Sequence, residues 1–111
     1  MLEDKRRFPR IRFSTPLRYQ IRGSREYGDT ITENISAGGI GFINNGFINP
    51  QTLVMLEINV LSRVLKSVAR ITWTLALPHS QRYHLGAEFM ELPLPEQKYL
   101  QDFIDLQTGK L

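Results

Sequence analysis

The sequence contains no cysteine among its 111 residues. Disulfide bridges, thiolate metal sites and cysteine nucleophiles are therefore excluded, and this composition fits the reducing cytoplasm in which we expect the protein to work. No apolar stretch approaches the roughly 20 residues that span a bilayer, and the basic N-terminal residues are not followed by the apolar segment of a secretory signal. The length predicts one domain with one core. The lack of a long apolar stretch predicts no membrane insertion.

Acidic residues are scarce at the N-terminal end, where basic residues gather. Eight of the fourteen lysines and arginines lie in the first 25 residues, together with two acids, Glu3 and Asp4. The last 25 residues reverse the balance, with five acids and two lysines. This asymmetry predicts an anionic partner for the N-terminal end, either a nucleotide, a nucleic acid or a membrane surface. The simpler alternative is a basic, solvated tail.

Residues for catalysis are also few. The two histidines are His79, in a predicted loop beside Ser80, and His84, on a predicted strand with its side chain at the surface. Glu88 and Glu91 are three residues apart, and on a strand this spacing places them on opposite faces, so they do not form a carboxylate pair. Neither a GxxxxGK[ST] phosphate-binding motif nor a cluster of metal ligands occurs. The sequence therefore predicts a protein that is not an enzyme and that holds no metal or cofactor.

Hydrophobic periodicity predicts six short strands followed by one helix. The run 52–61 is almost continuously apolar and is expected to be buried on both faces, and Trp73 is expected in the core. Pro95 suits a first helical turn, and the helix is expected to end before Gly109. This pattern predicts a mainly β protein, a small antiparallel barrel or sandwich capped by a helix. The strands are expected at 17–22, 27–35, 39–43, 52–61, 68–75 and 83–91.

Two short motifs remain after this survey. The first is Arg6-x-x-x-Arg10 in the stretch KRRFPRIRF, and the second is Asn34-x-Ser36-x-x-Gly39 in NISAGG. Each is weak evidence alone. The second is also a good turn, because Asn and Ser bond to nearby backbone groups and Gly supplies a positive φ.

The order and spacing of these motifs resemble the PilZ domain family, and Gly86-Ala87-Glu88-Phe89 resembles the Gly-x-x-Phe of its last long strand. The resemblance extends from about Lys5 to Ile104. It implies a six-stranded antiparallel β-barrel with a C-terminal helix that acts as a binding module, and many members bind cyclic di-GMP (c-di-GMP). On this reading, residues 1–15 form a basic flexible arm, 16–92 the barrel and 93–108 the helix.

The resemblance also implies the binding residues. The Asn of the second motif stands where many members have Asp. Arginine suits this ligand because its planar fork of donors meets a phosphate bidentately and can also address or stack on guanine. Asn and Ser can satisfy a guanine edge, and glycines let the backbone approach the ligand closely. The implied residues are Arg6, Arg7, Arg10, Asn34, Ser36, Gly38 and Gly39.

These residues suggest a mechanism in which c-di-GMP recruits a mobile arm and clamps it against the Asn34–Gly39 loop, so that the protein offers a changed surface to a partner protein. The partner, its pathway (motility, exopolysaccharide or virulence) and the number of bound ligands stay open. One alternative is a PilZ-like adaptor that binds no c-di-GMP. Another is a basic nucleic-acid-binding barrel. Stable nucleic-acid binding is not expected, because Tyr19, Phe42 and Trp73 follow the periodicity of the core instead of forming an exposed platform.

Overall fold

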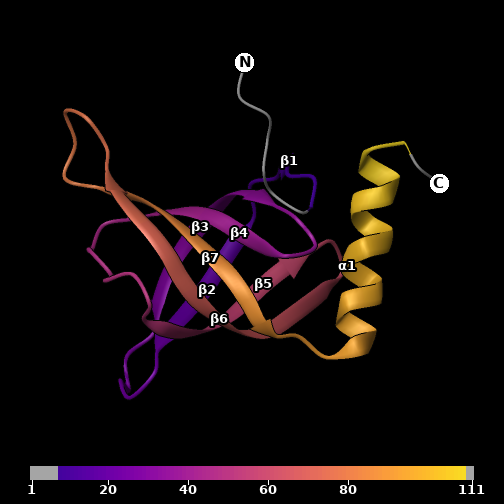
Figure 1. Cartoon of the computed structure of the whole chain (residues 1–111), viewed down its shortest axis with the longest axis horizontal. Coiled ribbons are helices and arrows are strands. Elements are labelled where there is room, and N and C mark those ends of the chain that lie inside the picture. The colour runs from indigo at the N-terminus through magenta and orange to yellow at the C-terminus, as the bar shows by residue number, and fades with distance from the viewer. Residues whose placement is uncertain (1–7, 110–111) are drawn as a thin grey trace.

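Seven strands and one helix form the part of the chain, residues 8–109, that the computed structural model describes (Figure 1). Every pairing between the strands is antiparallel. The elements are β1 (Ile11–Arg12), β2 (Pro16–Ile21), β3 (Gly28–Ile35), β4 (Gly39–Asn44), β5 (Leu53–Val60), β6 (Arg63–Ala76), β7 (Tyr83–Glu91) and α1 (Leu94–Gln107).

The strands close into a barrel. Their order is β1-β3-β2-β5-β6-β7-β4, and a further pairing of β3 with β4 joins the two sides of the sheet. Closure satisfies the backbone groups that an open sheet would expose at its edges. The predicted mainly β fold, a six-stranded antiparallel barrel followed by one helix, is confirmed, with β1 as an additional short strand.

The additional strand β1 runs along β3 in line with β2. Arg12 pairs with Asn34, and Pro16 pairs with Ile31. From Arg12 to Pro16 the chain advances four residues, whereas the paired residues of β3 advance only three. The segment that joins β1 to β2 therefore contains one extra residue, as in a β-bulge. Residues 11–13 of the predicted arm therefore pair with the barrel wall. The flexibility of the arm remains a prediction, and residues 1–7 lie outside the described residues.

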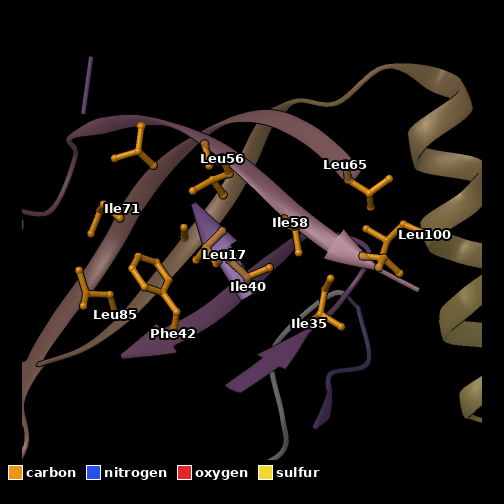
Figure 2. Packing of buried hydrophobic residues seen from close by; sticks show 14 of the residues in the cluster. Leu17, Ile35, Ile40, Phe42, Leu56, Ile58, Leu65, Ile71, Leu85 and Leu100 are labelled. Atoms are coloured by element: carbon orange, nitrogen blue, oxygen red, sulfur yellow. The ribbon is translucent and has the colours of Figure 1, made fainter. Parts of the chain in front are cut away.

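One face of each barrel strand supplies the core. In β5, Val54, Leu56 and Ile58 are at most 1% exposed, whereas Met55 is 44% exposed. The expectation that this strand is buried on both faces is therefore wrong, because its second face lies on the outside of the barrel, where Glu57 also lies. Figure 2 labels ten core residues: Leu17, Ile35, Ile40, Phe42, Leu56, Ile58, Leu65, Ile71, Leu85 and Leu100.

The helix α1 lies at one end of the barrel, and the β6–β7 hairpin extends from the opposite end (Figure 1). Leu100, Phe103 and Ile104 recur at helical spacing and are buried against the barrel. The Phe103 ring lies 4.8 Å from the Phe13 ring, measured between centroids, and the Tyr99 hydroxyl donates a hydrogen bond to a barrel carbonyl. Within residues 8–109, no helix has the length and apolar character needed to cross a membrane.

Two residues of the barrel wall differ from expectation. Trp73 is half-buried outside the core, and its indole covers Gly86, where an added Cβ would lie 2.3 Å from the ring. His84 is half-buried instead of exposed, because its ring meets the edge of Trp73 and its Nε2 lies 2.7 Å from Glu33 Oε1. Phe42 is fully buried, as predicted.

Candidate ligand-binding site

The two predicted motifs meet through a direct side-chain contact. Arg10 Nη1 donates a hydrogen bond of 2.6 Å to Asn34 Oδ1, across 24 positions of sequence. The pairing of β1 with β3 carries the arm past Asn34, and Gly41 leaves room for the Asn34 amide, whose Nδ2 lies 2.7 Å from the position of a Cβ at Gly41. Arg6 and Arg7 lie outside the described residues, so their predicted roles are not addressed by these contacts.

Ser36 organises the loop that follows β3. Its hydroxyl oxygen accepts the backbone N–H groups of Gly38 and Gly39, both at 3.1 Å, and its own N–H donates to the Gly39 carbonyl at 2.9 Å. The residue is buried, with 4% exposure. Ser36 therefore holds the loop in shape, which is a use of the hydroxyl that the motif alone did not reveal. A direct contact between Ser36 and a ligand remains a prediction.

The two loop glycines are required for close approach and not for a left-handed backbone. Among the described residues, the glycines with positive φ are Gly23 and Gly109, so the expected positive φ in this loop is wrong. A Cβ at Gly39 would lie 2.1 Å from the Ala87 carbonyl oxygen of β7, and a Cβ at Gly38 would lie 2.5 Å from the Phe8 ring. The loop thus packs tightly against both the barrel and the arm.

The arm, the loop and two barrel strands enclose a hollow of about 210 Å³. This volume lies below the roughly 300–1,000 Å³ of pockets that hold a whole drug-sized ligand. The hollow is therefore large enough for one part of a nucleotide. It is lined by Phe8, Arg10, Ser36, Gly38, Thr72, Ala87 and Glu88.

Glu88 and Arg70 form an ion pair in the wall of this site. Arg70 Nη2 lies 2.8 Å from Glu88 Oε1, because the β6–β7 register places the two residues opposite each other. Phe8, Thr72, Ala87 and Glu88 line the hollow but were not predicted as site residues. Phe8 stands inside the first motif, and Ala87 and Glu88 occupy the variable positions of Gly-x-x-Phe, which are weak signals, whereas Thr72 enters the site only through the closure of the barrel.

A larger hollow lies elsewhere on the molecule. It has a volume of about 630 Å³, and Met55, Val68 and Met90 give it a mostly apolar wall on the outside of the barrel. It contains no residue of either motif. In the described part of the chain, no group of three or more acidic or histidine side chains is arranged to hold a metal ion. The convergence of the two motifs, and not size, therefore selects the smaller hollow as the candidate site.

Comparison with known proteins identifies the family. The family model described as PilZ domain matches residues 4–106. The chain therefore belongs to the PilZ domain family, as the motifs indicated. A sequence comparison with curated proteins gives no significant match.

Solved structures share the fold. The Bacillus subtilis inhibitor of motility MotI/DgrA superimposes with a TM-score of 0.82 at 23% identity, over 97% of this chain and 54% of that protein. The K. pneumonia MrkH–c-di-GMP complex gives 0.76 at 16% identity, over 97% and 54%. YcgR from Escherichia coli in complex with c-di-GMP gives 0.75 at 17% identity, over 96% and 47%. The chain thus spans about half the length of these three proteins, and at such identities the likeness supports the fold.

Proposed function

We propose that this protein is a receptor module for c-di-GMP, and a binding protein instead of an enzyme. The dinucleotide is held between the arginine arm (Arg6, Arg7 and Arg10) and the Asn34–Gly39 loop. The observation that carries the proposal is the 2.6 Å contact between Arg10 and Asn34, which joins both motifs at the edge of one hollow. Membership of the PilZ family supports it, as do the c-di-GMP complexes of the structurally similar MrkH and YcgR.

The Arg10–Asn34 hydrogen bond explains how the site can accept an anion. A phosphate oxygen displaces Asn34 Oδ1 from the Arg10 guanidinium, because hydrogen bonds between two charged groups are shorter and stronger than those with a neutral amide. Asn34 then turns to the ligand, where its amide can both accept and donate hydrogen bonds. Arg10 and Asn34 thus each exchange the other for a group of the ligand, so the loss of their mutual hydrogen bond leaves neither of these two groups unsatisfied.

The same exchange provides a signal to a partner protein. The Phe8 ring rests against Gly38, two residues before Arg10 in the arm. When Arg10 turns from Asn34 to a phosphate, we expect the neighbouring segment around Phe8 to shift, which would change the surface above the loop. NMR order parameters for residues 5–13, measured with and without c-di-GMP, test this switch. Identical order in both states would refute the switch while leaving binding intact.

Calorimetric titration of c-di-GMP tests the binding itself, with GTP as the control ligand. Arg10→Ala and Arg6→Ala are compared with Arg12→Ala, a matched control because Arg12 is exposed in the same arm outside both motifs. A charge-assisted contact contributes about 1.5–3 kcal/mol, so each motif variant should bind at least about tenfold more weakly, and Arg12→Ala should bind normally. Absence of saturable binding by the wild type would refute the proposal and favour the adaptor.

A further inference from the structure

Glu88 is an acid inside a site proposed for an anionic ligand. Among the described residues it is the one carboxylate that lines the 210 Å³ hollow. It lies on β7 between Arg70 of β6 and Gly39 of β4, in one row across three strands. Arg70 engages Oε1, while Gly39 has no side chain on the other flank. The Glu88 side chain is 51% exposed, so its carboxylate can be reached from the hollow.

A carboxylate in such a place needs a ligand that offers donors. An ionised carboxylate only accepts hydrogen bonds, and beside a phosphate it would be repelled. Of the parts of c-di-GMP, the Watson–Crick edge of guanine presents two adjacent donors, N1–H and the N2 amino group. Adenine has an acceptor at N1 and no amino group at C2. The chemistry of Glu88 therefore matches guanine and opposes adenine.

The remaining walls of the hollow also suit a base. Phe8 contributes an aromatic side chain that is 41% exposed, and Arg10 contributes a guanidinium. Aromatic and arginine side chains stack on the faces of bases. The hydroxyl of Ser36 is occupied by the backbone of its own loop, so it offers little competition for the base edge.

We propose that Glu88 is a specificity-determining residue that accepts N1–H and N2–H of one guanine, and that Arg70 is a positioning residue that orients its carboxylate. This inference rests on the proposed c-di-GMP site and names the selectivity of that site. The ion pair also lowers the electrostatic cost of an acid near the phosphates, because Arg70 neutralises the charge of Glu88.

Titrations with c-di-GMP, cyclic di-IMP and cyclic di-AMP test the proposal. Inosine lacks the N2 amino group, and adenine also lacks the N1–H donor, so the ratios of the three affinities report recognition of this edge. In Glu88→Gln we expect the preference for c-di-GMP over cyclic di-IMP to fall by about tenfold, the scale of a hydrogen bond to a charged group. Glu91→Gln, on the same strand but outside the hollow, is the matched control and should retain the wild-type ratios.

A purely electrostatic role for Glu88 gives a different result. If Glu88 only neutralises Arg70, Glu88→Gln frees a positive charge, all three ligands bind more tightly by the same factor, and unchanged ratios overturn the inference. Glu88→Asp keeps the charge and shortens the side chain, so a reduced preference for c-di-GMP over cyclic di-IMP is expected there too. This variant is the decisive test if Glu88→Gln folds poorly. If the wild type binds c-di-GMP and the variants keep the wild-type affinity ratios, this inference alone is overturned. A wild type that binds none of the ligands overturns the proposed function and this inference with it.

Discussion

Replacing Gly39 with alanine should destabilise the barrel itself. The new Cβ would lie 2.1 Å from the Ala87 carbonyl oxygen, whereas real Cβ contacts are essentially never below 3.0 Å, so the two strands must separate locally by about 1 Å. Ala87 is 2% exposed and lies in a buried part of β7, which cannot retreat freely. The Gly39 carbonyl also accepts the N–H of Ser36 at 2.9 Å, and this bond would be strained.

The size of the effect follows from these contacts. Overpacking costs about 1–3 kcal/mol, and one weakened hydrogen bond adds about 1 kcal/mol, so the free energy of unfolding should fall by about 2–4 kcal/mol. For a domain of this size, each kcal/mol corresponds to about 4–8 °C, and the Tm should fall by roughly 8–32 °C. Urea titration followed by circular dichroism measures the free energy, and a thermal scan measures the Tm.

Gly38→Ala is the matched control for this prediction. Its Cβ would meet the Phe8 ring at 2.5 Å, and that ring belongs to a side chain at the arm, 41% exposed, which can swing away. We expect a loss below about 1 kcal/mol, as for most substitutions at tolerant sites. A Gly39→Ala protein as stable as the wild type would refute the steric reasoning. If that stable protein had lost c-di-GMP binding, approach of the ligand would instead explain the glycine.

Three further predictions concern the site and the helix. Asn34→Ala should weaken c-di-GMP binding by about tenfold in calorimetry, because it removes the amide that turns from Arg10 to the ligand, and unchanged affinity would contradict the proposed exchange. Ser36→Ala leaves two loop N–H groups without their acceptor, so the free energy of unfolding measured in urea should fall by about 1–3 kcal/mol. Full stability would show that the turn forms without the hydroxyl. Phe103→Ala removes a buried ring that packs at a tilt against Phe13, and in the same assay it should lower the free energy of unfolding by about 3–5 kcal/mol. A cost below about 1 kcal/mol would mean that the helix contributes little to the core.

The fold could be predicted from the sequence wherever one face of a strand is apolar. β2 and β7 alternate clearly, and the core faces read from them are those observed. β1 has two residues, too few to show any period. β6 begins at Arg63, five residues before the predicted start, because its first residues pair with β5 in a hairpin that periodicity alone did not reveal.

The binding site could be predicted only in part, because some of its contacts depend on how the whole barrel closes. Motif residues such as Arg10 and Asn34 could be named from their type and spacing, and the structure brings these two together. Glu88 could not be identified in the same way. Its position beside the loop depends on the register between β4 and β7, whose paired residues are some 49 positions apart at Gly39 and Glu88. Such a register follows from closure of the whole barrel and has no local signature.

The contact between Phe13 and Phe103 has a consequence for how the protein is made. It joins the beginning of the described chain to its last helix, and Leu100 and Ile104 complete the same core. A ribosome releases the strands first and the helix last, and domains fold as units during synthesis. Until α1 emerges, the barrel lacks its end cover, and the nascent strands present apolar faces to the cell. The core of this domain can therefore be completed only after α1 has been synthesised.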